Sequence, residues 1–147
     1  MKSYVISAWL VLLSTIACLQ TVNCSYTPLM STVNEKDVDL VKRLLANGAD
    51  AKATNINGQA ALMIAAENGN EKLAELLLPK SNAKANNKYG DTALMIAAYY
   101  YYGNKRVVEL LLPKSDAKAT DNHGLTALDY AKSYGHKQIV RLLQQYN

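Results

Sequence analysis

The sequence contains one six-residue stretch twice, Ala61-Leu62-Met63-Ile64-Ala65-Ala66 and Ala93-Leu94-Met95-Ile96-Ala97-Ala98. A second stretch, Leu-Leu-Leu-Pro-Lys-Ser, also occurs twice, at residues 76–81 and 110–115. A glycine opens each unit, at Gly58, Gly90 and Gly124, so the period is 32 and then 34 residues. Self-similarity at a fixed period of this length indicates a repeat architecture.

Each unit is predicted to form two short helices. In the stretch 61–66, positions 62, 65 and 66 carry apolar side chains with the spacing of one helix face. A polar turn at 68–70 follows, and the leucines at 73, 76 and 77 repeat that spacing until Pro79, whose ring ends a helix. One such unit cannot bury both of its apolar faces alone, so the units are expected to stack on one another.

This pattern resembles the ankyrin-repeat family. The residues that carry the resemblance in the third unit are Gly90-Asp91-Thr92-Ala93-Leu94, Ala97-Ala98, Gly103, Val107-Val108 and Leu111-Leu112. Residues 44–53, Leu-Leu-Ala-Asn-Gly-Ala-Asp-Ala-Lys-Ala, match the second half of the family pattern. The resemblance implies an all-α solenoid of about four helix-turn-helix repeats with short hairpin loops. Their expected bounds are 25–57, 58–89, 90–123 and 124–147.

Two of the chain's departures from the family pattern bear on the candidate site and on the contacts between units. The family's histidine in the first helix is replaced by Met63, Met95 and Asp129, so the resemblance implies that its usual hydrogen bonds between neighbouring units are missing. The third unit gains two residues, and both are tyrosines, at the end of the run 99–102. These departures affect the expected local geometry and leave the expected fold unchanged.

Residues 1–24 are predicted to be a secretory signal peptide. The first four residues carry one positive charge, and residues 5–19 are mostly apolar and uncharged. An apolar run of about 15 residues is short for a membrane span, which needs roughly 20. Cleavage before Ser25 would give an exported protein, secreted or periplasmic, without cysteine. Two alternatives remain open, lipidation of Cys18 in a degenerate lipobox and an uncut segment, and either would give a membrane-anchored protein.

The tyrosine run 99–102 is the best candidate for a binding site. In the family's register, a partner is bound by the turns between paired helices, by the residues after the opening glycines and by the hairpin tips. The residues that the resemblance assigns to a partner-binding face are Tyr89, Asp91, Tyr99, Tyr100, Tyr101, Tyr102, His123, Leu125 and Tyr134. Tyrosine suits this role because its large, rigid ring carries a hydroxyl group. The alternative is that some of the run packs against neighbouring units, since successive helical residues point about 100° apart.

The sequence favours a non-catalytic module that binds another protein. It shows no phosphate-binding glycine loop, metal-ligand cluster or paired nucleophile and base, so we expect no cofactor, no metal site and no enzymatic activity. A formal net charge of +4 is too small to indicate nucleic-acid binding. The expected function is an exported, monomeric protein-interaction module with a concave binding face. The competing hypothesis is a membrane-tethered scaffold or an accessory subunit that stabilises one constitutive partner.

Overall fold

The computed structural model describes residues 26–100 and 104–146, and within them the chain is helical. Eight α-helices follow one another in these ranges: α2 (Pro28–Asn34), α3 (Val38–Ala46), α4 (Ala61–Glu67), α5 (Glu71–Leu77), α6 (Ala93–Tyr99), α7 (Lys105–Leu111), α8 (Ala127–Ser133) and α9 (Lys137–Gln144). Short 3₁₀ turns, η1 (Leu78–Lys80) and η2 (Leu112–Lys114), continue α5 and α7. The prediction of an all-α fold is confirmed.

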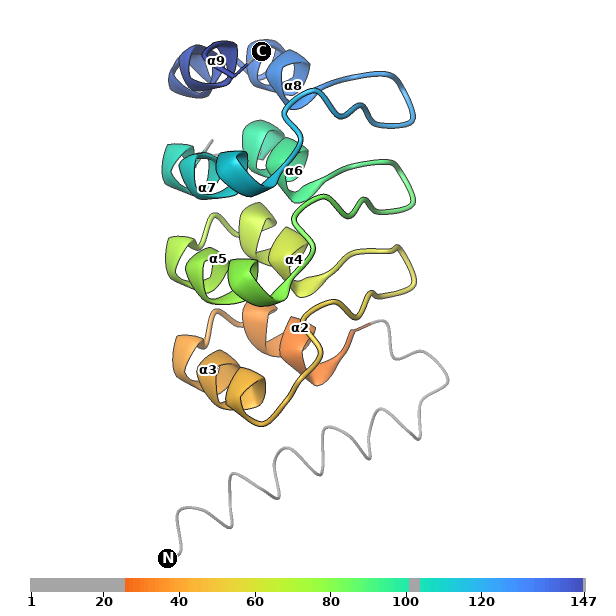
Figure 1. The fold of residues 1–147 in the computed structure, drawn as a ribbon, viewed down its shortest axis with the longest axis vertical. Coiled ribbons are helices and arrows are strands. Elements are labelled where there is room, and N and C mark those ends of the chain that lie inside the picture. Colours follow the sequence, from red (N-terminus) through yellow and green to blue (C-terminus); the bar gives the residue numbers. More distant parts are fainter. Residues whose placement is uncertain (1–25, 101–103, 147) are drawn as a thin grey trace, which may run out of the picture.

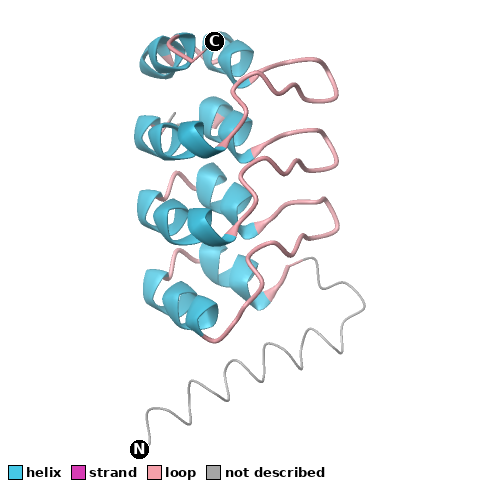
Figure 2. Ribbon diagram, viewed as in Figure 1, coloured by secondary structure: helices cyan, strands magenta, loops and turns pink. Residues whose placement is uncertain are grey.

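The helices pair and the pairs stack into a column (Figure 1). The first helices, α2, α4, α6 and α8, pack on one another in one layer, and the second helices, α3, α5, α7 and α9, pack in the other. The loops that join one pair to the next all project to the same side of the column (Figure 2). This arrangement is the predicted solenoid of helix-turn-helix units with hairpin loops.

The duplicated stretch forms the centre of the core. Every residue of 61–66 and of 93–98 is at most 2% exposed. The spacing predicts that one face of each helix is buried, but these residues are buried on all sides. The reason is that α4 lies between α2 and α6, and α6 lies between α4 and α8. The alanines let these helices approach closely, and Leu73, Leu77 and Leu111 fill the space toward the second layer.

Side chains cap most of the helix starts. Thr27, Asp37, Asn70, Thr92, Asn104 and Thr126 each accept a hydrogen bond from a backbone N–H in the first turn of α2, α3, α5, α6, α7 and α8. Ala60, which precedes α4, has no side chain that can do this. At the other end, α5 stops at Leu77 and Pro79 lies inside the following 3₁₀ turn, so the proline marks the end of the α-helix as predicted.

The hairpin loops share one hydrogen-bond pattern. Asn55, Asn87 and Asp121 occupy equivalent positions, and the Oδ1 atom of each accepts bonds from the backbone N–H groups two and four residues later. Successive hairpins are also joined, since the N–H of Lys88 donates to the carbonyl of Asn57 at 2.9 Å. The N–H of Asn122 donates to the carbonyl of Tyr89 at 3.0 Å in the same way.

Other polar groups also link neighbouring units, although the family's histidine is missing from the first helices. The hydroxyls of Ser81 and Ser115 lie 3.4 Å from the carbonyls of Ala51 and Ala83, one unit away. His136 Nδ1 lies 2.8 Å from the carbonyl of Ala98, at the end of the preceding repeat's first helix. His136 therefore links the third and fourth repeats.

Candidate binding surface

Four tyrosine rings gather where the third repeat meets the fourth. Tyr99 is the last residue of α6, and its ring centroid lies 5.0 Å from that of Tyr100, 5.2 Å from Tyr130 and 6.0 Å from Tyr134. Tyr130 lies within α8, and Tyr134 is its C-cap. We call Tyr99, Tyr100, Tyr130 and Tyr134 the tyrosine cluster. Contact between α6 and α8 brings its members together.

The cluster has an inner and an outer pair. Tyr99 and Tyr130 are half-buried, whereas Tyr100 is 36% exposed and Tyr134 is 58% exposed. Tyr99 therefore packs between repeats, as the alternative for the run expects, whereas Tyr100 reaches the surface and is open to a partner. The ring of Tyr99 contacts both outer rings, which lowers the entropy that they would lose on binding.

Two hydroxyl groups of the cluster donate to carboxylates. Tyr100 donates to Oε1 of Glu67, on the preceding repeat, and Tyr130 donates to Oδ2 of Asp121, in the hairpin before α8. These hydrogen bonds raise the pKa of Tyr100 and of Tyr130. Burial, together with the charges of Asp91 and Glu67, raises the pKa of Tyr99 to about 12. The phenols are therefore neutral at physiological pH.

Asp121 is a buried carboxylate that stays ionised. Burial alone would raise its pKa, but the hydrogen bonds from Tyr130 and from the backbone N–H groups of Leu125 and His123 outweigh burial and lower the pKa overall. Hydrogen bonds to the charged form of a carboxylate favour that form. Asp121 thus places a negative charge at the hydroxyl of Tyr130.

The remaining predicted residues that the structure describes lie in the hairpins. Tyr89 is 61% exposed and Leu125 is 40% exposed, and His123 is also exposed. Asp91 is only 9% exposed, and its carboxylate accepts a hydrogen bond from Nδ2 of Asn87 at 3.1 Å. The burial of Asp91 differs from the exposed position that the family register suggests, because its side chain completes the polar pattern of its own loop.

The hairpin residues and the tyrosine cluster lie at opposite ends of the first helices. Tyr89 precedes α6 and Tyr99 ends it, and a helix of seven residues is roughly 10 Å long. The predicted set is therefore divided into a hairpin group and a cluster group. Tyr101, Tyr102 and Cys18 lie outside the described residues.

Sequence reasoning missed Tyr130 and Glu67 as members of this site. Tyr130 stands where the two preceding repeats have Ile64 and Ile96. A phenol side chain with a hydroxyl group therefore replaces an aliphatic one at this position of the last repeat. Comparing Ala-Leu-Asp-Tyr-Ala with Ala-Leu-Met-Ile-Ala would have revealed that signal. Glu67 stands at the same turn position of its repeat as Tyr99, so the register places it close to the tyrosine run. Its hydrogen bond with Tyr100 is known only from the fold.

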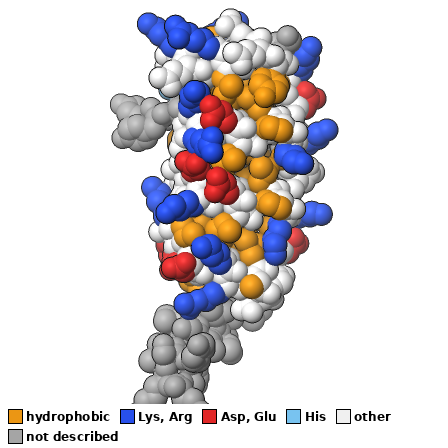
Figure 3. Space-filling model, turned by 60° about the vertical axis from the view of Figure 1, so that its left-hand side comes forward, with side chains coloured by type: hydrophobic (Ala, Val, Ile, Leu, Met, Phe, Trp, Pro, Cys, Tyr) orange, Lys and Arg blue, Asp and Glu red, His pale blue; other side chains and the backbone are white. Residues whose placement is uncertain are grey.

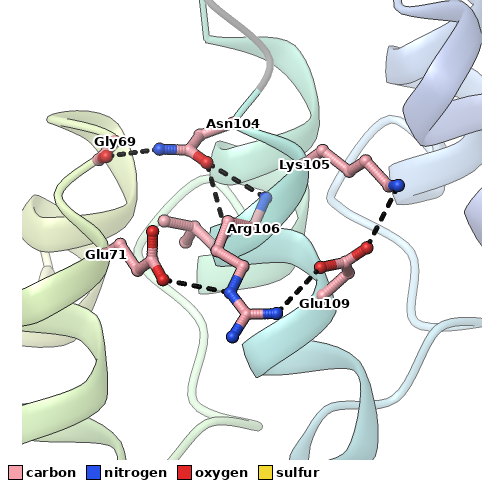
Figure 4. Close-up of polar contacts among 7 residues, drawn as sticks. Gly69, Glu71, Asn104, Lys105, Arg106 and Glu109 are labelled. Carbon is pink, nitrogen blue, oxygen red and sulfur yellow. Dashed lines mark hydrogen bonds and ion pairs between the residues drawn. The ribbon is translucent and has the colours of Figure 1, made fainter.

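A groove of about 900 Å³ adjoins the cluster on the side of the second repeat. Lys36, Glu67, Asn68, Tyr100, Asn104 and Arg106 are among its lining residues. Arg106 lies close to Glu71, with Nε at 3.0 Å, and to Glu109, with Nη1 at 3.3 Å (Figure 4). The same figure shows Lys105 paired with Glu109, so the basic side chains at the start of α7 are held by carboxylates.

The surface in Figure 3 shows acidic and basic side chains mixed along the length of the column, with apolar groups between them. Among residues 26–100 and 104–146, no cluster of His, Cys, Asp and Glu has the size needed to hold a metal ion. None of the helices in those ranges combines the length and apolar character that crossing a membrane would require.

Comparison with protein families agrees with the geometry. The family model described as "Ankyrin repeats (3 copies)" matches residues 10–88, 29–121 and 81–147, which overlap to cover most of the chain. A comparison with curated proteins gives no significant match. The family match rests on the same repeated units that form the column.

Proposed function

Because the chain belongs to the ankyrin-repeat family, we propose that it is an exported, non-catalytic module that binds a protein partner through its concave face. Ankyrin repeats are in general protein–protein interaction modules. The tyrosine cluster is the observation that supports a partner site on this chain. It offers two accessible rings, at Tyr100 and Tyr134, on a framework of packed helices.

The energetics of aromatic side chains support this site. Tyrosine is enriched among the interface residues that dominate affinity, and truncation of such a residue typically costs about 2 kcal/mol or more. Because Tyr99 contacts both Tyr100 and Tyr134, the two exposed rings are already held before a partner arrives. The hairpin residues Tyr89, His123 and Leu125 extend the proposed contact area.

The first experiment identifies a partner by cross-linking in the native cells and measures its affinity for the purified chain and for a Tyr100→Ser, Tyr134→Ser variant. We expect binding to weaken at least roughly 30-fold, which corresponds to about 2 kcal/mol. The thermal midpoint should change little, because both rings are exposed. Tyr146→Ser is the matched control, since Tyr146 is 51% exposed and outside the cluster. Unchanged affinity in the double variant would refute the proposed site.

Export is proposed from the N-terminal segment, and the intact mass of the protein from its native cells tests it. A mass that begins at Ser25 would support a soluble exported module. A lipidated Cys18 or the full 147 residues would favour the second candidate, a membrane-tethered scaffold or accessory subunit. A free module should also be monomeric and stable alone, whereas a subunit should aggregate without its partner.

A further inference from the structure

The chemistry of the tyrosine cluster indicates what kind of side chain it can receive. Each tyrosine ring has a negative face, which attracts a cation that lies within about 6 Å of the ring centroid. Two of the four hydroxyls donate to carboxylates, Tyr100 to Glu67 and Tyr130 to Asp121. A phenol that donates to an anion gains electron density, so its ring face attracts a cation more strongly.

The charged groups that act on the phenols of Tyr99, Tyr100 and Tyr130 are carboxylates. They belong to Glu67, Asp91 and Asp121. Lys36 lines the adjoining groove. In the same groove, Arg106 is held by Glu71 and Glu109, and Lys105 is paired with Glu109. The cluster is therefore locally negative on a chain whose formal net charge is +4.

The arrangement of the rings leaves their faces available. Tyr100 and Tyr134 are tilted by 38° and 36° to the ring of Tyr99, so neither ring is covered by flat stacking. Both reach solvent, at 36% and 58% exposure. The carboxylate of Glu67 is bonded to the hydroxyl of Tyr100, and that of Asp121 to the hydroxyl of the inner Tyr130, so both can add to the attraction of a positive charge.

We propose that the tyrosine cluster binds a cationic side chain, an arginine or a lysine, presented by the protein partner. This inference rests on the proposed function, because it names the chemistry of the partner at the same site. Charge complementarity favours this occupant, since an acidic side chain would be repelled and an apolar one would leave the carboxylates without an opposite charge. Arginine fits better than lysine, because its planar guanidinium stacks on aromatic rings and pairs with carboxylates.

The test is a selection of random short peptides, displayed on phage, against the full chain. Selected peptides are then synthesised with each arginine replaced by citrulline, which keeps the shape and removes the charge. We expect the selected peptides to contain arginine or lysine, and citrulline to weaken binding about fivefold or more by fluorescence anisotropy. On a Tyr134→Leu or a Glu67→Gln chain, the loss caused by citrulline should shrink.

Tyr146→Leu is the matched control, since it makes the same chemical change at an exposed tyrosine that lies outside both the cluster and the hairpins. The effect of citrulline should be unchanged on that variant. Peptides without a cation that still depend on Tyr100 or Tyr134 would overturn this inference and leave the proposed binding face intact. A selection in which no peptide depends on the cluster would overturn both.

Discussion

The second and third repeats share a core and differ at its edge. The six residues 61–66 in α4 and 93–98 in α6 are identical and buried to the same degree. The next residue is Glu67 in one repeat and Tyr99 in the other. After Glu67 the chain turns through Gly69, which has a φ of 60°, whereas Tyr100 leaves α6 in an extended conformation with a ψ of 148°.

This comparison shows which positions the fold leaves free. The residues buried on all sides are identical in α4 and α6, which pack on each other and each have a second helix on the opposite side. The end of the first helix meets solvent, so it can change in sequence, conformation and length without disturbing the stack. The tyrosine cluster lies at this permissive end.

The largest expected effect tests whether the two cores are equivalent. We expect Leu62→Ala and Leu94→Ala each to lower the free energy of unfolding by about 3 kcal/mol, because both remove a fully buried side chain and leave a cavity. Urea denaturation followed by circular dichroism measures the two values. Leu125→Ala, at an exposed leucine, is the control and should cost less than about 0.5 kcal/mol. A difference between Leu62 and Leu94 of more than about 1 kcal/mol would show that identical sequence does not give equal packing here.

Substitution of the opening glycines is expected to destabilise the repeats to different extents, although their cores are alike. Gly58, Gly90 and Gly124 all have a positive φ, but a Cβ atom at Gly90 would lie 2.6 Å from the backbone nitrogen of Asn122. At Gly58 the nearest atom would be 3.2 Å away, and at Gly124 nothing lies within 4 Å. We expect Gly90→Ala to cost about 2 kcal/mol more than Gly124→Ala, with Gly58→Ala between them.

The same denaturation measurement checks that order. Gly124→Ala serves as the control for the backbone strain alone, since all three substitutions force alanine into the left-handed region. An equal loss of unfolding free energy at all three positions would contradict the predicted order, because it would mean that neighbouring hairpins can move apart to admit a Cβ atom without destabilising the chain.

The helix starts offer a reciprocal exchange. Ala60 and Thr92 precede α4 and α6 with the same backbone conformation and similar burial. The hydroxyl of Thr92 accepts the N–H of Met95 at 3.3 Å, whereas Ala60 has no side chain that could cap α4. We expect Thr92→Ala to lower the free energy of unfolding by about 1 kcal/mol and Ala60→Thr to raise it by a similar amount. Thermal and urea unfolding of the two single variants measure this. A destabilised Ala60→Thr chain would contradict the equivalence of the two sites.

The smallest expected effect concerns pH and the hairpin position shared by Asn55, Asn87 and Asp121. The pKa of Asp121 is lowered in the folded chain, so its ionised form stabilises the fold above its ordinary pKa of 3.8, and that contribution is lost as the pH falls through the folded value. Asn55 and Asn87 show that asparagine fits the position. We expect Asp121→Asn to lose less stability than the unchanged chain between neutral pH and pH about 3, as measured by urea unfolding. An identical loss in both chains would be evidence against an ionised Asp121 held by these bonds.

Much of the fold could be predicted from the sequence, because comparing one repeat with the next shows which residues recur. The exact recurrence of 61–66 at 93–98 identifies the period, the spacing of its apolar residues identifies the helices, and Pro79 identifies where α5 ends. Burial of all six residues could not be read from one helix, because it depends on the copies above and below. Inter-repeat hydrogen bonds, such as that of His136 with Ala98, depend on those neighbours as well.

The candidate site was less predictable for a related reason. Tyr99, Tyr100 and Tyr134 were in the predicted set, yet how far each reaches solvent depends on the path of the chain after α6. Asp91 is an example of what the register cannot predict. Its position in the repeat suggests an exposed side chain, but its carboxylate accepts a hydrogen bond from Asn87 and is buried in the loop. Glu67 is 33 residues from Tyr100 in the sequence, and only the stacking of repeats brings the two together.

The hydrogen bonds between successive hairpins have a mechanical consequence. Lys88 is bonded to Asn57, and Asn122 to Tyr89, so each loop holds only the loop next to it. In a column joined in this way, no single contact spans several repeats and resists a force along its length. Under a stretching force it would lengthen in steps, one repeat peeling from the next, and each detached repeat would regain its place against the neighbour that remained folded.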